Sequence, residues 1–295
     1  VIYLFCRFHR DSAGAGRFRG GLANEYSITS CAAGGAPLDV VIYGTGTEYT
    51  QCQGFSGGYP GSNTGFVLYQ GGDMFEVLRQ GGFPETVEQI GGTQEHAVWG
   101  TYKLEQGEML HMSMMGGGGY GDPLERDPER VRNDVVYRMV SPECARDIYG
   151  VSLNENSELD LEETHRLREE MVQQRLQGWR EDSAVISRGD QTTSAGDEEE
   201  EPEHYSLNEN LRALKTSNGA AIHCTKCNHR LSQLEEPWKD RATVVRSPLT
   251  HSGPRRSESG RFEMRLYLCP RCGRSLDVEV ALPGDPPLHD WVVLA

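Results

Sequence analysis

The sequence lacks three features that would place it in familiar protein classes. It contains no apolar run of about 18 or more residues, no Gly-Lys-Ser or Gly-Lys-Thr triplet, and no repeat with glycine at every third position. These absences exclude a membrane-spanning helix, a phosphate-binding P-loop and a collagen helix, respectively. Basic residues are also scarce, because 29 Lys and Arg stand against 44 Asp and Glu and give a net charge of −15. We therefore expect neither a membrane protein nor a nucleic-acid-binding protein, which would need a basic surface.

Charge and glycine are distributed unevenly along the 295 residues. Residues 151–203 carry 16 acidic and 5 basic side chains, whereas residues 204–295 carry 10 acidic and 13 basic ones. Of the 35 glycines, 26 lie within residues 1–121. We therefore expect two folded units, residues 1–180 and 204–295, which are joined by an acidic, flexible linker over residues 181–203.

Apolar runs of strand length alternate with glycine pairs in the N-terminal part. Runs of about four to eight residues between such breaks indicate an all-β unit with many turns. The first run reads as a buried strand and starts without an initiator methionine, so we expect the chain to begin inside a domain. The predicted strands cover Val1–Cys6, Leu38–Tyr43, Gly65–Tyr69, Met74–Leu78 and Ala97–Leu104.

Two further segments, residues 52–65 and 115–121, contain too much glycine for regular strand pairing, and we expect an extended, polyproline-II-like or loop conformation. The second segment holds four consecutive glycines. Each costs about 0.5–1 kcal/mol relative to alanine when it is ordered in regular structure, so the run indicates a positive φ or a close backbone approach. We expect a tight crossing of chain segments, with a backbone cradle for a substrate as the alternative. The four residues are Gly116, Gly117, Gly118 and Gly119.

After the glycine run, the pattern changes to that of helices. Asp127 and Ser141 each precede a proline and an acidic residue, which is typical of an N-cap followed by a first helical turn. Gly150 is predicted to end the second helix as a left-handed glycine. A third helix is predicted from its cap at Asp160 to about Gln177. Its apolar face is narrow, so it is either a solvated arm or a helix that binds a partner.

The strongest signal for a functional site is a pair of Cys-x-x-Cys motifs with 41 residues between them. Two such motifs present four thiolates to one zinc ion and leave no position for water, so the site would be structural rather than catalytic. A disulfide pair and an iron–sulfur cluster are the alternatives. The long insert is predicted to contain strands at Arg241–Arg246 and Phe262–Leu268 with a polar tip at residues 252–260. The expected zinc ligands are Cys224, Cys227, Cys269 and Cys272.

The other four cysteines show no pairing pattern. Buried free thiols in a reducing cytoplasm fit them best. Oxidation of the four motif thiols would compete with metal binding, which also indicates a cytoplasmic protein. The four scattered cysteines are Cys6, Cys31, Cys52 and Cys144.

Two strings carry a family resemblance: GAGRFRGG at residues 14–21 and GGGGYGDPLERDPERVRNDVVYRMVSPECARDIY at residues 116–149. They closely resemble the end of the hydantoinase B family, which includes the B subunits of N-methylhydantoinases, 5-oxoprolinases and ATP-dependent ketone carboxylases. The resemblance covers roughly residues 1–155. It implies the C-terminal part of a B-type subunit, with glycine-rich, barrel-like sheets that run into polyproline-II segments and a few helices, here followed by a small zinc-ribbon domain.

The same resemblance implies a division of labour between chains. A hydantoinase A-like partner subunit would bind ATP and Mg and phosphorylate the substrate, and the B-type subunit would host the later chemistry in a hetero-oligomer. The known metal ligands of acetone carboxylases lie in the N-terminal part of the B-type subunit, so a second, catalytic metal would lie outside this chain. Catalytic residues stay unassigned. His96 and His111 stand alone in β-type runs, and we expect structural or surface roles for them.

The C-terminal part carries a second, shorter resemblance. The zinc motifs, together with the tail at residues 284–291 (GDPPLHDW), are similar to the zinc-binding gamma subunit of acetone carboxylases. This favours a subunit of an ATP-dependent ketone carboxylase-like complex, in which an activated ketone is carboxylated with bicarbonate. Two alternatives remain. One is a subunit of an ATP-dependent cyclic-amide hydrolase of the N-methylhydantoinase or 5-oxoprolinase type, and the other is a non-catalytic assembly subunit with a zinc staple.

Overall fold

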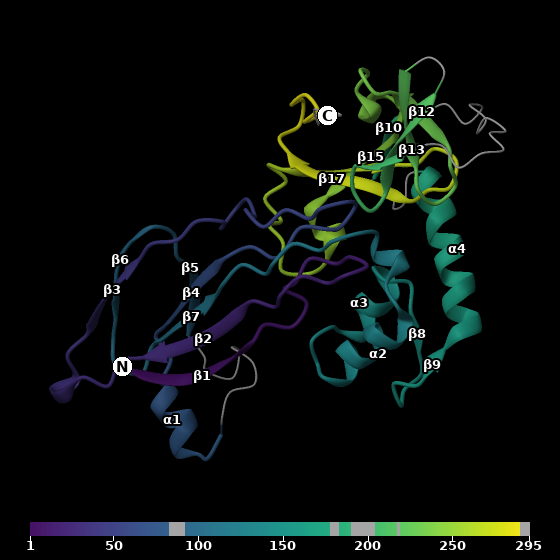
Figure 1. Ribbon diagram of the computed structural model, residues 1–295. Coiled ribbons are helices and arrows are strands. Elements are labelled where there is room, and N and C mark those ends of the chain that lie inside the picture. Colours follow the sequence, from purple (N-terminus) through teal and green to yellow (C-terminus); the bar gives the residue numbers. More distant parts are fainter. Residues whose placement is uncertain (83–91, 178–182, 190–203, 217–218, 290–295) are drawn as a thin grey trace.

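The structure is a computed structural model that describes residues 1–82, 92–177, 183–189, 204–216 and 219–289. It is mainly β, as predicted, and a group of helices lies beside two regions of strands (Figure 1). All sheets among the described residues are open, so the barrel-like closure that the resemblance implied is not found. In these same ranges, no helix is both long enough and apolar enough to cross a membrane.

The N-terminal region contains a five-stranded antiparallel sheet with the order β1-β2-β7-β4-β5. A second, two-stranded sheet, β3-β6, packs on one face of it through a shared apolar cluster. A short helix, α1 (Met74–Arg79), follows β4. The strands are β1 (Ile2–Phe8), β2 (Asn24–Thr29), β3 (Leu38–Ile42), β4 (Gly65–Gln70), β5 (Thr93–His96), β6 (Gly100–Leu104) and β7 (Met109–Ser113).

Side chains alternate between the two faces of the five-stranded sheet, because successive residues of a strand point to opposite sides. Ile28, Leu68 and Leu110 face β3 and β6 and are buried. The odd-numbered residues of β2, β4 and β7 face the other side, where the register pairs both Ser27 and Val67 with His111. One face of the sheet is thus an apolar core, and the other carries polar side chains next to a smaller apolar cluster that includes Tyr69 and Met109.

Three glycine-rich segments, residues 12–20, 52–62 and 116–121, lie beside one another and are linked by backbone hydrogen bonds. Gly14 N–H donates to Gly117 O at 2.8 Å, and Tyr59 N–H donates to Ala15 O at 2.7 Å. These segments form no named strand, in agreement with the extended conformation expected for the second and third of them. We call this arrangement the glycine bundle.

The helices begin where their caps predict. Asp127 caps α2 (Pro128–Val136), Ser141 caps α3 (Pro142–Asp147), and Gly150 follows α3 with a φ of 61°. Two short strands, β8 (Ser152–Leu153) and β9 (Leu159–Asp160), lead to α4 (Leu161–Gln177). One face of α4 buries Thr164, Met171 and Arg175. The interpretation of α4 as a solvated arm is therefore wrong for this face, which packs within the chain.

The C-terminal region contains two four-stranded antiparallel sheets, with the orders β11-β12-β13-β14 and β10-β15-β16-β17. Short 3-10 helices connect several strands, namely η4 (Trp238–Arg241) and η5 (Leu249–Ser252) here, and η1 (Ala33–Gly35) and η3 (Pro123–Glu125) earlier in the chain. The strands are β10 (Ala184–Ser187), β11 (His204–Ser206), β12 (Leu211–Thr216), β13 (Gly219–Cys224), β14 (Arg230–Gln233), β15 (Thr243–Pro248), β16 (Glu263–Leu268) and β17 (Ser275–Ala281).

The C-terminal region shares a hydrophobic core with the rest of the chain. Met264, Leu266 and Leu268 of β16 belong to the cluster that also holds Val131 of α2 and Ala145 of α3. Tyr267 of the same strand and Cys269, which follows the strand, belong instead to the core around the cysteine motifs. The two regions are therefore packed against each other rather than merely connected.

Several predictions need correction. Met74–Leu78 is helical rather than extended, because the Asp73 side chain caps it by accepting from Phe75 N–H and Glu76 N–H. β1 is an edge strand that buries only Leu4, rather than a buried strand.

Part of the predicted linker is also ordered. Ala184–Ser187 forms β10, which pairs with β15, while residues 190–203 lie outside the described residues. The four scattered cysteines are free, as expected, but Cys6 and Cys31 are exposed and only Cys144 is buried.

Candidate functional sites

The two Cys-x-x-Cys motifs meet at the boundary between the two C-terminal sheets. Cys224 ends β13 and Cys269 follows β16, so each of the two sheets positions one of the motifs. The four sulfur atoms lie within 4.8 Å of one another, with Cys224 Sγ 3.8 Å from Cys272 Sγ and Cys227 Sγ 3.6 Å from Cys269 Sγ. A tetrahedron with Zn–S bonds of about 2.3 Å places its sulfurs about 3.8 Å apart, so the donor set fits a structural zinc ion.

Each motif folds into a tight turn that aims both of its thiols at the same point. Cys224 N–H donates to His229 O at 3.0 Å, and Cys269 N–H donates to Arg274 O at 2.9 Å. Asn228 and Gly273 complete the two turns with positive φ values of 56° and 67°. Asparagine and glycine are the residues that adopt this left-handed conformation most readily.

The four consecutive glycines lie inside the glycine bundle. A Cβ atom on Gly116, Gly118 or Gly119 would overlap a backbone carbonyl of Ser12, Gln53 or Ala15, respectively. Gly117 is more open, with its nearest neighbour at 3.1 Å from the Cβ position. The close neighbours of this run are thus other segments of the chain itself, which favours the tight crossing over the substrate cradle.

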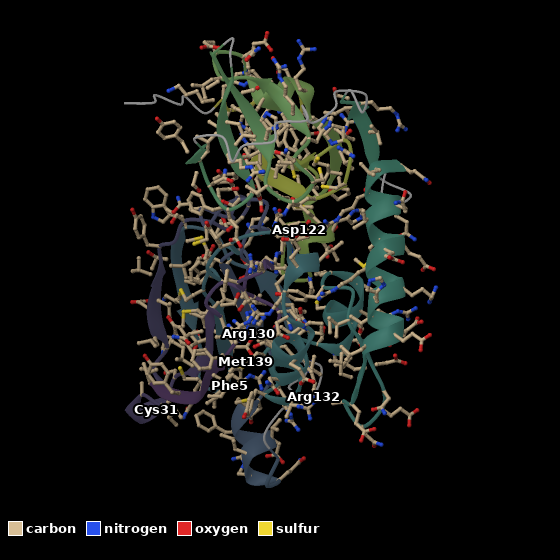
Figure 2. The ribbon with its side chains drawn as sticks, turned by 45° about the vertical axis from the view of Figure 1, so that its right-hand side comes forward. Phe5, Cys31, Asp122, Arg130, Arg132 and Met139 are labelled. Carbon is tan, nitrogen blue, oxygen red and sulfur yellow. The ribbon has the colours of Figure 1, made fainter. Side chains whose placement is uncertain are left out.

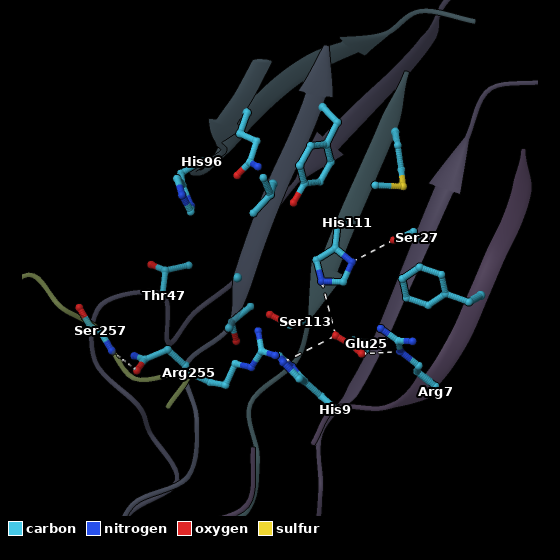
Figure 3. Close-up of a pocket in the computed structure, with 18 of the residues that line it drawn as sticks. Arg7, His9, Glu25, Ser27, Thr47, His96, His111, Ser113, Arg255 and Ser257 are labelled. Atoms are coloured by element: carbon cyan, nitrogen blue, oxygen red, sulfur yellow. Dashed lines mark hydrogen bonds and ion pairs between the residues drawn. The ribbon is translucent and has the colours of Figure 1, made fainter. Parts of the chain in front are cut away.

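The polar tip of the C-terminal region docks on the same bundle. The buried Arg256 guanidinium donates to the carbonyls of Asp11 at 2.7 Å, Pro60 at 2.8 Å and Ala13 at 3.1 Å. One arginine therefore ties the tip to two of the three glycine-rich segments. The preceding residue, Arg255, has a φ of 73° and projects toward the five-stranded sheet (Figure 3).

A pocket of about 510 Å³ lies on the polar face of that sheet (Figure 3). This volume is within the range of about 300–1,000 Å³ typical of small-molecule sites. The sheet supplies most of the lining, and the docked tip supplies the rest. The ionisable and hydroxyl-bearing residues that matter below are Arg7, His9, Glu25, His111, Ser113 and Arg255.

Glu25 lies at the centre of the charged cluster in this pocket. Its Oε1 accepts a hydrogen bond from Arg7 Nε at 2.6 Å, and its Oε2 lies 3.6 Å from Nε2 of both His9 and His111. Ser27 Oγ lies 2.9 Å from His111 Nδ1 and orients that ring. Neither ring nitrogen of the buried His9 makes a hydrogen bond in the described part of the chain.

The imidazoles of His9 and His111 are held in the neutral form. Burial lowers the pKa of His9 to about 4, with Glu25 opposing the change and Arg255 adding to it. Burial lowers the pKa of His111 as well. A neutral imidazole has one nitrogen that can accept a proton. Each of these two rings therefore offers a nitrogen that can accept a hydrogen bond at neutral pH.

Sequence reasoning missed most of this pocket. His96 and His111 were expected to be structural or surface residues, and the structure places both in its lining. The sequence pattern singles out neither Glu25 nor His9 as a functional residue. The alternation of polar and apolar residues over Asn24–Thr29 could have indicated one polar sheet face, but not the strands beside it.

Two family descriptions match this chain. Residues 1–123 match hydantoinase B/oxoprolinase, and residues 204–293 match the acetone carboxylase gamma subunit. The nucleotide-free structure of acetone carboxylase has a similar fold, with a TM-score of 0.50 and 23% identity over 60% of this chain and 25% of that chain.

Curated proteins match about half of this chain. The chain is 28% identical over 171 residues to the acetophenone carboxylase delta subunit of Aromatoleum aromaticum, which covers 54% of this chain and 25% of that protein. It is 30% identical over 156 residues to the caprolactamase subunit beta of Pseudomonas jessenii, which covers 52% of this chain and 24% of that protein. The chain thus spans about a quarter of the length of these relatives. Both resemblances seen in the sequence are confirmed: a hydantoinase B/oxoprolinase segment over residues 1–123 is joined in one chain to an acetone carboxylase gamma-like segment over residues 204–293.

Proposed function

We propose that this chain is part of a subunit of an ATP-dependent ketone carboxylase-like complex, which joins bicarbonate to an activated ketone. The observation that carries the proposal is the union, in one packed body, of a hydantoinase B-type segment and a segment similar to an acetone carboxylase subunit. The similarity to a subunit of acetophenone carboxylase supports the same branch.

Other chains would complete the reaction. A hydantoinase A-like partner would bind ATP and Mg and activate the substrate. The N-terminal part of a hydantoinase B-like subunit would be a further partner if it is on a separate chain, and that part would hold any catalytic metal. We place this hetero-oligomer in the cytoplasm, because a site of four free thiols is stable in a reducing compartment. This chain would contribute the structural zinc site and the pocket in which Glu25 lies beside His9 and His111.

The test is ADP release by the natively isolated assembly with a panel of ketones, in the presence and absence of bicarbonate. Release that requires both a ketone and bicarbonate is the expected result. ADP release with a ketone that is independent of bicarbonate would overturn the carboxylase proposal.

The second candidate is a subunit of an ATP-dependent cyclic-amide hydrolase, and the similarity to a caprolactamase subunit favours it. ADP release that is stimulated by a hydantoin, 5-oxoproline or caprolactam without bicarbonate would select it. A third candidate is a non-catalytic assembly subunit. Discovery of a complete hydantoinase B-type chain in the same complex would support that role.

A further inference from the structure

We propose that the pocket on the polar face of the five-stranded sheet binds a small carboxylate anion, and that Arg255 is the residue that ligates it. The pocket is built from both segments of the chain, because the sheet belongs to the N-terminal segment and Arg255 to the gamma-like segment. The proposal concerns binding and does not depend on which reaction the assembly catalyses.

Arg255 is a cation of this pocket whose donors are all available. In the ranges that the structure describes, its guanidinium makes no ion pair and no hydrogen bond. Arg7, by contrast, is paired with Glu25, and Arg256 donates to backbone carbonyls. The positive charge of Arg255 therefore has no ion-pair partner in the described part of the chain, although it lies in the same pocket as the neutral imidazoles of His9 and His111.

The position of Arg255 is fixed by its neighbours rather than left to a mobile loop. Asn63 N–H donates to Arg255 O at 3.1 Å, and Ser257 N–H donates to Asn63 Oδ1 at 2.9 Å. The next residue, Arg256, is anchored in the glycine bundle by its hydrogen bonds to Ala13 O and Pro60 O. These contacts hold Arg255 at a φ of 73°, a conformation that residues other than glycine seldom adopt and that is enriched at functional sites.

The remaining lining selects the class of anion. A guanidinium presents parallel N–H groups that match the two oxygens of a carboxylate. His9, whose ring nitrogens make no hydrogen bond within the described residues, and the Ser113 hydroxyl add polar groups at the same end. Val67 and Met109 line the pocket as well and can contact a short carbon chain. The site thus fits a carboxylate with a small apolar body.

The experiment measures binding to the natively isolated assembly by calorimetry at constant ionic strength, without ATP. The probes are bicarbonate, acetoacetate and 6-aminohexanoate, with acetone as an uncharged reference. The main variant is Arg255→Asn, since asparagine tolerates a positive φ. Arg255→Lys keeps the charge, and Arg130→Gln removes an exposed arginine that does not line the pocket. Zinc content and thermal melting report whether each variant is folded.

We expect one site per chain for at least one carboxylate, and about tenfold weaker binding in Arg255→Asn. Arg255→Lys should lose less, and Arg130→Gln and acetone should show no change. Which probe binds distinguishes bicarbonate from an organic acid. Unchanged affinity in folded Arg255→Asn, or no binding of any carboxylate, would overturn the proposal.

A second measurement needs no variant. The bound carboxylate should protect Arg255 from phenylglyoxal, as read by mass spectrometry of the unaltered protein, and equal modification with and without the carboxylate would count against the site. Because neither measurement requires turnover, the binding proposal can fail while the carboxylase function stands, and the reverse also holds.

Discussion

Arg175 of α4 donates from one nitrogen, Nη1, to both carboxylate oxygens of Asp122 at 2.9 Å, and both side chains are buried. The second guanidinium nitrogen donates to Tyr59 Oη at 3.1 Å, and Ser275 N–H donates to Asp122 Oδ2 at 2.8 Å. The pair therefore joins α4 and the start of β17 to Tyr59 of the glycine bundle and to Asp122, which directly follows the third glycine-rich segment (Figure 2).

Replacement of Arg175 by methionine should destabilise the protein by about 3–5 kcal/mol, because it leaves the Asp122 carboxylate buried without its cation. Urea unfolding, followed by circular dichroism, measures the change. The matched control on the same helix is Arg166→Met, which removes an arginine that pairs with Glu163 and Glu170 at the surface. We expect no resolvable change there, since exposed ion pairs contribute little. Equal stability of the two variants would contradict the structural role of the buried pair.

Gly118→Ala should prevent the glycine bundle from closing. The new methyl group would overlap the Gln53 carbonyl, and a backbone atom cannot move aside as a flexible side chain can. Loss of soluble protein or of the cooperative thermal transition is the expected result. Gly21→Ala is the matched control, because no atom lies within 4 Å of its Cβ position and its φ is not positive. That change should shift stability by less than about 1 kcal/mol. Normal folding of Gly118→Ala would refute the close crossing.

His9 should make the protein less stable in mild acid. Its pKa is about 4 in the folded protein, against about 6.5 in an unfolded chain. Between these values, the unfolded state binds a proton that the folded state does not, so stability falls as the pH falls from about 6.5 to 4. The loss is on the order of 2–3 kcal/mol.

Urea unfolding at a series of pH values should show a shallower decline for His9→Gln than for the original protein. His111 contributes in the same direction, because burial lowers its pKa too, so part of the slope should persist. The control is His165→Gln, at an exposed position on α4, which should keep the full slope. An unaltered pH profile in His9→Gln would show that this histidine does not carry the effect.

Cys269→Ser should abolish zinc binding and unfold the C-terminal region, since metal binding and folding are coupled in such sites. Atomic absorption gives the zinc content, and amide hydrogen exchange reports the folded state of β13 to β17. Cys6→Ser replaces an exposed cysteine outside the four-thiol cluster and should retain one zinc per chain. Full zinc retention by Cys269→Ser would rule out the four-cysteine site.

Features that depend on neighbouring residues could be predicted from the sequence. Asp127, Ser141 and Asp160 each accept a hydrogen bond from the first turn of a helix, and the cysteine turns depend on four to six consecutive residues. The α1 helix was missed even though Asp73 is a good cap, because a short apolar run does not separate a strand from a buried helix.

Features that depend on distant pairing could not be predicted. Glu25 lies beside His111 only because β2 pairs with β7. The register of two strands so far apart in the sequence cannot be deduced from the residues of either strand. Arg255 reaches the pocket only because the neighbouring Arg256 donates hydrogen bonds to three backbone carbonyls, in segments that precede it by about two hundred residues. The positive φ of Arg255 could not be predicted from the residue type, because arginine is not typical of this conformation.

The single strand β16 turns alternate residues toward two cores, with Leu266 and Leu268 on the helices and Tyr267 and Cys269 on the thiol cluster. Any ion that the four thiolates hold adds a free energy of RT ln(1 + [ion]/Kd) to the folded state. Because side chains of β16 belong to both cores, this free energy stabilises the helix-containing core as well as the core around the thiols. With a metal ion bound there, the folded fraction of the whole chain, including the sheet and pocket at its opposite end, would depend on the supply of that metal in the cell.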